Sequence, residues 1–547
     1  MTSSIIREKS AVERFLNRHQ QWIIGLVVMP TSFAHSTFHS LVRRVKGWGP
    51  RPSLERVREQ HTVRVERVRR DVEQWSQLPA DNRPAIRTDR ASAASHSVRT
   101  ADKSSAHRVG MQDFDQVLGI DLERGTVTVE PFVTVGALTS FLLQHDRMLE
   151  ATLEMEDATL GGLALTQGMT THSHRCGLVH DTVRRYELVT GRGERIEATP
   201  TENRDVYDAA GFSHGSLGFL TALDLTIVPA SPELLVTYTQ CTSITDLHAR
   251  YEHAILNTDA FFLEAIVFSQ DHAVLIRGDL LTEESRAEAR SRGARTNKQG
   301  RWYKTWFFRH AEQAPDGHQE LMPMRDYLMR HDRSMCMTML QIFPAANHPL
   351  IRWPLGWMLP PKVTFLKAMR PASTRLDVAK EQIYQDLAIP MNRLPEMLDE
   401  VDDRIGIYPL LVYPCLVKDR GGFISVPNGQ PAPGSDDVTQ QVFLNLGIYG
   451  TPSAIAEGDQ TYNVISETRA LLAKVRDIGG FQHSYCDVFQ TREEFYEMFD
   501  DRLASEVRAR LGSDGLQEVY EKVRPEIPWQ DWTPRPDPEA LSGSGGG

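Results

Sequence analysis

Residues 159–177 form a segment in which glycine, threonine and serine alternate with apolar side chains. Glycine allows positive φ angles and lets backbone N–H groups come close to a ligand, so we expect these glycines to lie outside helices. Hydroxyl groups add donors for phosphate or carbonyl oxygens. The segment predicts a polyphosphate cofactor site, with a plain glycine-rich connection between strands as the alternative. The candidate cofactor-binding residues are Thr159, Leu160, Gly161, Gly162, Leu163, Ala164, Leu165, Thr166, Gln167, Gly168, Met169, Thr170, Thr171, Ser173, His174 and Gly177.

A second glycine element, at 211–221, predicts a tight turn that opens into a strand. It adds Gly215 and Gly218 to the candidate cofactor-binding residues. Apolar periodicity and turn residues indicate the elements that position both segments. These are strands at 127–130 and 223–229, a helix at 135–145, and a hairpin of strands at 186–190 and 195–198.

The composition is that of a soluble globular chain, and its 547 residues are too many for one core. Lys and Arg number 61 against 72 Asp and Glu, which gives a net charge of −11 and argues against nucleic-acid binding. The five cysteines lie far apart, so we expect neither a disulfide framework nor a cysteine-rich metal site.

Near the N-terminus, residues 22–29 form an apolar run that is shorter than the roughly 20 residues needed to cross a bilayer. We interpret residues 15–42 as a membrane-associating helix, either interfacial or a marginal single span. A buried amphipathic helix is the alternative.

Residues 43–70 carry ten basic side chains against three acidic ones, which suits an anionic cytoplasmic membrane surface. The same segment predicts a helix with an apolar stripe that docks on the body while the arginines face lipid. A calmodulin-like partner for residues 43–70 is an alternative. The stripe consists of Leu54, Val57, His61, Val65, Val68, Val72 and Trp75.

Several motifs resemble those of the Δ24-sterol reductases, a group within the vanillyl-alcohol oxidase and p-cresol methylhydroxylase (PCMH) superfamily of FAD-binding proteins. The resemblance extends over most of the chain, and the motifs in its second half are specific to this group. The motifs lie at 19–22, 129–134, 159–177, 218, 302–310, 356–365 and 492–500.

The resemblance implies an α+β fold with a two-lobed FAD-binding domain of the PCMH type, an α+β cap (substrate) domain and an N-terminal membrane-associating helix. The expected divisions are a membrane-associating segment at 1–50, the FAD-binding domain at 51–230, the cap at 231–470, a C-terminal segment completing the cap and flavin site at 471–535, and a flexible tail at 536–547.

The resemblance also implies noncovalent FAD, NADPH as electron donor, and reduction of the Δ24 side-chain double bond of a sterol. The proton would go to C24 and the flavin hydride to C25. An isolated alkene accepts hydride poorly, so a buried general acid is required. The candidates are Asp487, Glu493 and Glu494, with Tyr485 and His174 as further alternatives. We expect His174 to form a hydrogen bond rather than a covalent flavin link.

The expected cap is rich in methionine between 322 and 339, which predicts a hydrophobic substrate pocket or ordinary core. Residues 301–309 and 352–370 mix aromatic and basic side chains, so they suit either a lipid headgroup boundary or a packing surface between domains. The expected partners are a sterol and membrane lipids. The expected location is the cytosolic face of a membrane, the endoplasmic reticulum in a eukaryote.

One segment departs from the pattern of many flavoproteins of this fold. Residues 91–97 contain no glycine where a glycine-rich pyrophosphate loop is usual, and no G-x-G-x-x-G motif follows a strand. Two other functions therefore stay open. One is an FAD-dependent oxidase or dehydrogenase of an alcohol, and the other is a catalytically silent, membrane-associated interaction protein.

Overall fold

The computed structural model describes residues 23–46, 53–90, 103–257, 259–368, 378–424, 439–459, 461–525 and 529. The glycine-free segment 91–97 and the tail 536–547 lie outside the described residues, as does Arg51 of the basic segment.

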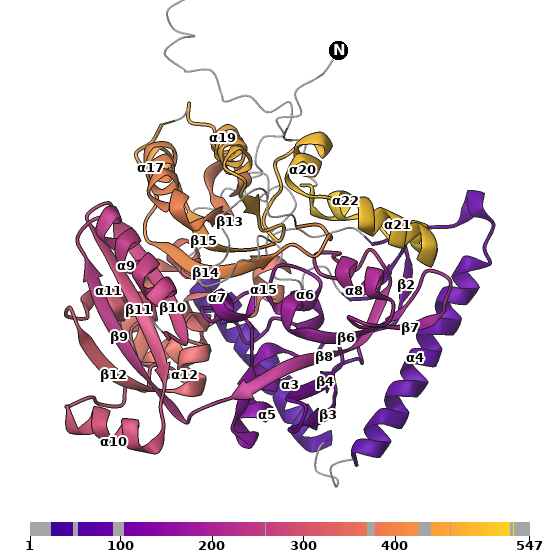
Figure 1. Ribbon diagram of the computed structural model, residues 1–547, viewed down its shortest axis with the longest axis horizontal. Coiled ribbons are helices and arrows are strands. Elements are labelled where there is room, and N and C mark those ends of the chain that lie inside the picture. Colours follow the sequence, from indigo (N-terminus) through magenta and orange to yellow (C-terminus); the bar gives the residue numbers. More distant parts are fainter. Residues whose placement is uncertain are drawn as a thin grey trace, which may run out of the picture.

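The first lobe is built on an antiparallel sheet in the order β3-β4-β8-β6-β7, with β5 paired to β8 (Figure 1). The expected strands, helix and hairpin are all present. The strands are β3 (Val117–Asp121), β4 (Thr126–Val129), β5 (Arg147–Leu149), β6 (Val183–Val189), β7 (Arg195–Ala198) and β8 (Phe219–Pro229). The helices of this lobe are α5 (Val135–Leu142), α6 (Leu160–Ala164), α7 (Ser173–Cys176) and α8 (Arg204–Ala210).

A small parallel pair stands beside this sheet, made of β1 (Ile86–Thr88) and β2 (His107–Val109). The pair flanks residues 91–102 and belongs to the same lobe, because Ile86 and Val109 are fully buried in a cluster with Val189 and Phe219.

The second lobe holds an eight-stranded antiparallel sheet in the order β12-β9-β11-β10-β14-β15-β13-β16. Its strands are β9 (Glu233–Cys241), β10 (Phe262–Ser269), β11 (His272–Leu280), β12 (His318–Pro323), β13 (Ile383–Pro390), β14 (Leu410–Lys418), β15 (Gln440–Gly450) and β16 (Phe481–Gln482). Helices α9 (Ile244–Asn257), α17 (Leu394–Arg404) and α19 (Val464–Asp477) form a row against it. The change of sheet falls between β8 and β9, while the domain divisions themselves stay predictions.

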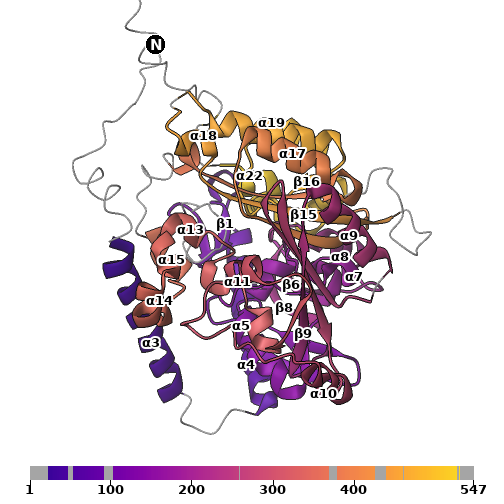
Figure 2. The same ribbon diagram turned by 90° about the vertical axis from the view of Figure 1, so that its left-hand side faces the viewer.

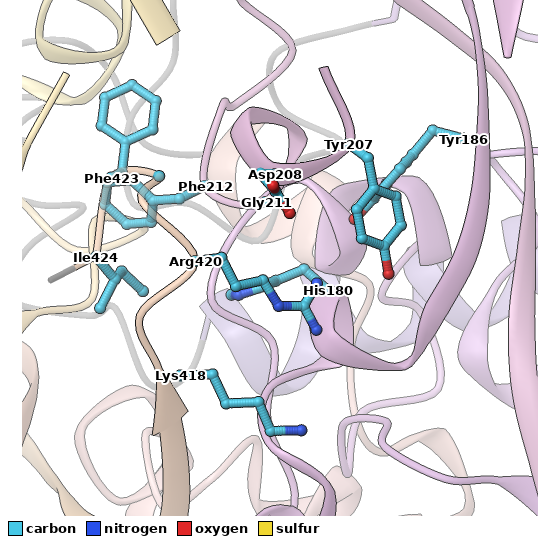
Figure 3. A pocket seen from close by; sticks show the side chains of 11 residues that line it. His180, Tyr186, Tyr207, Asp208, Gly211, Phe212, Lys418, Arg420, Phe423 and Ile424 are labelled. Atoms are coloured by element: carbon cyan, nitrogen blue, oxygen red, sulfur yellow. The ribbon is translucent and has the colours of Figure 1, made fainter. Parts of the chain in front are cut away.

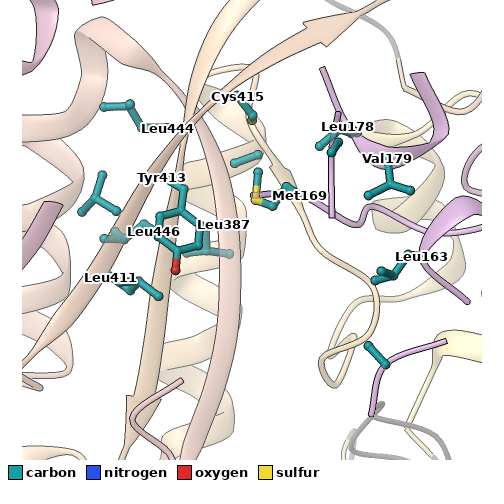
Figure 4. Packing of buried hydrophobic residues seen from close by; sticks show 14 of the residues in the cluster. Leu163, Met169, Leu178, Val179, Leu387, Leu411, Tyr413, Cys415, Leu444 and Leu446 are labelled. Atoms are coloured by element: carbon teal, nitrogen blue, oxygen red, sulfur yellow. The ribbon is translucent and has the colours of Figure 1, made fainter. Parts of the chain in front are cut away.

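The two lobes meet where the glycine segment 159–177 packs on the central strands of the second sheet. Helix α7 lies against β14, and the backbone N–H of Leu263 donates to the carbonyl of Thr171 at 2.9 Å. Apolar side chains from both lobes fill the junction (Figure 4). The labelled ones are Leu163, Met169, Leu178 and Val179 from the first lobe, and Leu387, Leu411, Tyr413, Cys415, Leu444 and Leu446 from the second.

Helix α4 (Leu54–Ser76) confirms the predicted stripe and its docking on the body, except that Leu54 is exposed. His61 lies between two buried carboxylates, with Nδ1 2.7 Å from Glu130 and Nε2 3.0 Å from Glu187. Burial alone would lower the pKa of His61, but hydrogen bonds to both carboxylates outweigh burial and raise it. The buried stripe is Val57, His61, Val65, Val68, Val72 and Trp75.

The arginines of α4 differ from the expectation that they face lipid. Arg58 donates to the carbonyl of Leu118, and Arg64 donates to Glu130 at 2.6 Å. Arg67 and Arg69 likewise bind groups of the first lobe. A calmodulin-like partner would have to pull this helix off the sheet to reach its apolar stripe.

The N-terminal helix begins with one π turn, Ile24–Val28, and continues as α3 (Met29–Lys46). Among the described residues, no helix is long and apolar enough to cross a membrane. One side of this helix is buried against the second lobe, where Ser32 accepts a hydrogen bond from the backbone N–H of Lys362 at 2.8 Å. Figure 2 shows α3 beside α14 (Pro349–Leu355) and α15 (Val363–Ala368).

The chain returns to the first lobe at its C-terminal end through α20 (Arg492–Met498), α21 (Arg502–Leu511) and α22 (Val519–Val523). Helix α21 packs on α8, and Ser513 donates to the carbonyl of Leu217 at 2.6 Å. Gly515 lies so close to Trp75 of α4 that a Cβ at this glycine would come within 2.0 Å of the indole. The C-terminal segment therefore packs on the same lobe as α4 and completes it.

Candidate active site

The glycine segment contains more helix than its composition predicts. Gly161 and Gly162 lie inside α6, so the expectation that these glycines lie outside helices is wrong. This helical turn forms because residues outside the segment fix its first two residues. Leu160 N–H donates to the Val133 carbonyl, and Gly161 N–H donates to the Pro131 carbonyl at 2.9 Å. Within the segment, Gly177 has the positive φ angle, 91°.

The glycines serve two different purposes. A Cβ at Gly161 would lie 2.4 Å from that of Pro131, so this glycine permits close packing inside the protein. A Cβ at Gly162 would meet the Thr159 hydroxyl at 3.1 Å and nothing else within 4 Å. Gly162 therefore leaves an open surface at the start of α6, where a ligand can approach the backbone.

The second glycine element lies directly against the first, because His214 N–H donates to the Leu165 carbonyl at 2.9 Å. Gly215 has a φ angle of 70°, as the predicted tight turn requires. A Cβ at Gly218 would come within 2.7 Å of the Val189 carbonyl, so this glycine is needed for packing on β6. The structure thus brings the two sequence-predicted elements together.

The two histidines of the glycine segment hold it to the second lobe. His172 Nδ1 donates to the Phe261 carbonyl at 2.6 Å, and His174 Nε2 donates to the Ala260 carbonyl at 3.1 Å. Burial lowers the pKa of both imidazoles to about 4, so they are neutral at pH 7. His174 therefore acts as a hydrogen-bond donor in this structure, and its Nδ1 is buried with no partner among the described atoms.

A cluster of cations lies beside the second glycine element. Lys522 of α22 donates to the His214 carbonyl at 2.9 Å, and its Nζ would lie 4.0 Å from a Cβ at Gly215. Burial, together with the charges of Arg508, Arg87 and Lys103, lowers the pKa of Lys522 to about 7. We call Arg87, Lys103, Arg508 and Lys522 the cation cluster.

Asp89 attracts Lys103, and Glu518 and Asp514 attract Arg508, but among the described residues no carboxylate forms a salt bridge with the cation cluster. Burial lowers the pKa of Lys103 to about 8, with Arg87 and Arg90 adding to the shift. The Nε of Arg87 is buried with no hydrogen-bond partner among the described atoms. Repelling cations and an unpaired guanidinium nitrogen are the features of a site that binds an anion from outside. Sequence patterns did not reveal the cluster, because Lys522 and Gly215 are far apart in the chain.

The predicted general acids lie elsewhere. Glu494 caps α20 through Thr491 and pairs with Arg469 at 2.9 Å, and Glu493 is exposed. Burial would raise the pKa of Glu494, but the hydrogen bonds from Thr491 and Arg469 outweigh it and lower the pKa. An ionised carboxylate holds no proton to donate, so this geometry favours a structural role for Glu494. The catalytic roles of Glu493, Glu494 and Asp487 stay predictions.

A small, open pocket is lined by residues of both lobes (Figure 3). Its cations are already engaged: Arg420 pairs with Asp181 at 2.7 Å, and Lys418 donates to the Cys176 carbonyl at 2.9 Å. The rest of its polar lining comes from His180, Tyr186, Tyr207 and Asp208. None of the predicted site residues lines this pocket.

Comparisons with known proteins agree with the geometry of the first lobe. Residues 90–199 match the family model of an FAD binding domain. The chain is 30% identical to the delta(24)-sterol reductase of Homo sapiens, over 93% of this chain and 94% of that protein. It is 28% identical to the delta(24)-sterol reductase of Arabidopsis thaliana, and 26% identical to the delta(24)-sterol reductase homolog dhcr-24 of Caenorhabditis elegans. The alignment with the Arabidopsis thaliana protein covers 95% of this chain and 93% of that protein. The alignment with the Caenorhabditis elegans protein covers 93% of this chain and 95% of that protein.

The residues present fit FAD. The turn at Gly215 borders the cation cluster, and Arg90, whose charge acts on Lys103, donates to the Thr159 hydroxyl beside Gly162 at 3.2 Å. The pyrophosphate of FAD carries the negative charge that would pair with the cluster. The match to the FAD-binding family begins at residue 90, which adjoins β1 and its unpaired Arg87. Lys522 and Arg87 would hold the pyrophosphate, and the backbone at Gly162 would approach the cofactor.

Replacing Gly162 with valine should remove bound FAD without unfolding the protein. The new side chain meets only the Thr159 hydroxyl within the protein, but it occupies the face on which the cofactor would lie. The measurement is the flavin absorbance per mole of purified protein, with circular dichroism as the check on folding. Gly110→Val is the matched control, because a Cβ there also meets nothing within 4 Å. A folded Gly162→Val variant with full FAD content would show that the cofactor lies elsewhere.

Replacing Lys522 with methionine should weaken FAD binding and stabilise the apoprotein. A lost charge-assisted hydrogen bond of about 1.5–3 kcal/mol corresponds to a Kd raised roughly 10- to 100-fold. The folded pKa of about 7 lies below the ordinary lysine value, so Lys522 destabilises the apo fold at pH 7 and less so as pH rises toward 10.

Two measurements check this prediction: an FAD titration by flavin fluorescence, and the melting temperature of the apoprotein between pH 7 and pH 10. The melting temperature of Lys522→Met should exceed that of the parent at pH 7, and the difference should shrink toward pH 10. Lys298→Met, at an exposed lysine, is the control. If Lys522→Met bound FAD with the affinity of the parent, Lys522 would not be part of the cofactor site.

Proposed function

The chain belongs to the delta(24)-sterol reductase family, and on this basis we propose that it reduces the Δ24 side-chain double bond of a sterol, with FAD bound in the first lobe and NADPH as the electron donor. It is an FAD-dependent oxidoreductase. The similarity to the sterol reductases carries the proposal, because it extends over both lobes rather than over the FAD-binding residues 90–199 alone.

When bound, FAD supplies the redox chemistry: it takes electrons from a nicotinamide and passes a hydride to an acceptor. The chain itself must bind the cofactor, hold the alkene against it and deliver a proton. The cation cluster and the two glycine elements suit the first task. The neutral His172 and His174 fix the glycine segment beneath the second lobe, so the cofactor and the cap keep one relative position.

The surroundings of the junction suit an apolar substrate. Leucines of β13 and β15 are buried near the junction (Figure 4), and Leu387, Leu444 and Leu446 are all fully buried. An apolar lining would exclude water from a reduced cofactor and would accept a hydrocarbon side chain at little cost. This supports a sterol rather than a small polar alcohol as substrate.

We also propose that the protein rests on a membrane through one apolar face. The N-terminal helix and the segment around α14 combine to form it: the rings of Phe33 and Trp357 meet edge to face at 4.4 Å, and Gly25 packs on Phe343. Trp302 donates to the Trp353 carbonyl at 3.3 Å, which brings residues 301–309 to the same place. The exposed members of the apolar face are Leu26, Val27, Phe38, Trp302, Leu350, Trp353 and Trp357.

The apolar face joins two features that the sequence predicts at a membrane: the N-terminal helix, and the aromatic and basic segments 301–309 and 352–370. Leu350 is 80% exposed and Trp353 is 60% exposed, which is unusual for large apolar side chains that lie side by side. Arg352 and Lys362 lie within the same segment and suit the headgroup boundary. A sterol dissolved in lipid would then reach the protein by a short path, and attachment to the cytosolic side of a membrane would follow.

The proposed function predicts that anaerobic NADPH bleaches the flavin absorbance of the detergent-purified protein, and that a Δ24-unsaturated sterol restores it with formation of the saturated side chain. The measurements are visible spectra and mass spectrometry of the sterol. The matched control is the same sterol already saturated at C24, which should leave the flavin reduced. A flavin that NADPH does not bleach would contradict the reductase and would favour an alcohol oxidase.

The apolar face predicts that Leu350→Ser combined with Trp353→Ser weakens binding to phosphatidylcholine and phosphatidylserine vesicles. Each buried large apolar side chain contributes about 1.5–3 kcal/mol, so the pair should lower the partition coefficient by at least roughly 100-fold. Vesicle co-sedimentation measures this. The control is Leu122→Ser with Val63→Ser, at exposed positions on the first lobe and on α4. If both double variants lost vesicle binding equally, the apolar face would not be the membrane-binding surface.

A further inference from the structure

The second lobe contains a buried carboxyl group surrounded by two tyrosines. Asp386 on β13 is 1% exposed. It accepts hydrogen bonds from Tyr449 Oη at 2.7 and 2.6 Å and from Asn445 Nδ2 at 2.8 Å, and Tyr485 Oη also donates to it. Both tyrosines are only partly buried, so they lie between the carboxyl and more accessible space.

This cluster lies where the second lobe touches the predicted cofactor site. Ser484 N–H donates to Gln167 Oε1 at 3.0 Å, and the Ser484 hydroxyl pairs with His214 Nε2 at 3.0 Å. Gln167 belongs to the first glycine element and His214 to the second. Tyr485 is therefore the next residue after the one that bridges both cofactor-binding elements.

The sequence makes room for the cluster and leaves some of its polar atoms unpaired. A Cβ at Gly447 would lie 2.8 Å from the Tyr449 hydroxyl, so glycine at this position lets the tyrosine reach Asp386. Asn445 Oδ1 and His483 Nε2 are buried and have no hydrogen-bond partner among the described atoms. Unpaired buried acceptors and donors beside a carboxyl group indicate a site that a ligand or water completes.

The protonation of the cluster is set by burial. Burial raises the pKa of Asp386 to about 6, although hydrogen bonds from Tyr449 and Tyr485 oppose the shift. The titratable groups that face Asp386 from neighbouring elements are Tyr449, Tyr485, Cys336 and Cys486. In its neutral form Asp386 donates its own proton to one tyrosine oxygen, and that tyrosine can then direct its hydroxyl proton outward.

We propose that Tyr485 is the catalytic residue that delivers the proton to C24, and that Asp386 and Tyr449 are positioning residues that resupply this proton. The assignment rests on the proposed function, since it concerns the same reaction. Among the candidates that the sequence offered, it favours Tyr485, which was one of the further alternatives, over Asp487, Glu493 and Glu494.

The step balances as follows. The π electrons of the C24–C25 double bond take the Tyr485 hydroxyl proton and form the new C24–H bond, while C25 accepts a hydride, with its electron pair, from the reduced flavin. The tyrosinate left at Tyr485 takes the carboxyl proton of Asp386. A proton from solvent then reaches Asp386 through Tyr449, and NADPH supplies the two electrons of the next cycle.

The test separates the two half-reactions by stopped-flow absorbance. Tyr485→Phe and Asp386→Asn should be reduced by NADPH at the parent rate, because neither change touches the cations that hold FAD. Reoxidation by a Δ24 sterol should slow roughly 10²- to 10⁴-fold in Tyr485→Phe, the size expected for a lost general acid. In the parent the reoxidation rate should fall as pH rises through about 6, and this dependence should vanish in Asp386→Asn.

Tyr408→Phe is the matched control. Tyr408 donates to Asp402 at 2.8 Å, so this change also removes a tyrosine–aspartate hydrogen bond, but in a pair outside the proposed relay. A second readout needs no turnover. The raised folded pKa of Asp386 means that its contribution to stability is present below pH 4 and is lost as pH rises through about 6. The difference in melting temperature between the parent and Asp386→Asn apoproteins should therefore change over this window.

Three outcomes overturn the relay. If Tyr485→Phe reoxidises as fast as the parent, Tyr485 is not the donor and the proposed function stands. If only Asp386→Asn behaves like the parent, with its pH dependence intact, the resupply path is wrong. If the parent itself is not reoxidised by the sterol after NADPH has reduced it, the proposed function fails and the relay fails with it.

Discussion

The attachment of the glycine segment 159–177 to the second lobe is the interaction on which the rest of the structure depends. The segment offers its open side to the cofactor, and its other side is fixed by Thr171, His172 and His174 to the strand that begins at Phe262. On that strand, Glu264 binds the fully buried Arg330 at 2.6 Å. Breaking such a pair costs about 3–5 kcal/mol, because it leaves a charge buried and unpaired. The junction between the lobes is therefore rigid where the chemistry needs it.

The two lobes prepare opposite electrostatic environments on the two sides of this junction. In the first lobe, Lys522 and Arg87 are held close to other cations, which costs stability until an anion arrives. In the second lobe, burial makes Asp386 easier to protonate than an ordinary carboxyl, by raising its pKa to about 6. A charged cofactor tail and a proton-dependent reaction on an apolar substrate require this contrast.

Local patterns in the sequence predicted much of the first lobe, because its elements are defined by neighbouring residues. The stripe from Val57 to Trp75, the hairpin of β6 and β7 and the turn at Gly215 all follow from periodicity and glycine placement. The helix at Leu160–Ala164 was missed because Pro131 and Val133, which fix its first two residues, lie some thirty residues earlier in the chain. The cation cluster and the Asp386 cluster were missed for the same reason: each joins residues from distant segments, and no local pattern marks them.

The contact of Gly515 with Trp75 joins the last helices of the chain to the first long one. Two members of the cation cluster, Arg508 and Lys522, also come from these last helices. A chain that is still being made on the ribosome thus lacks half of its phosphate-binding charge until translation is nearly complete. The first lobe begins at Leu54 of α4 but gains Lys522 of α22 only late in synthesis, so we expect a nascent chain to reach its full affinity for the cofactor late in translation.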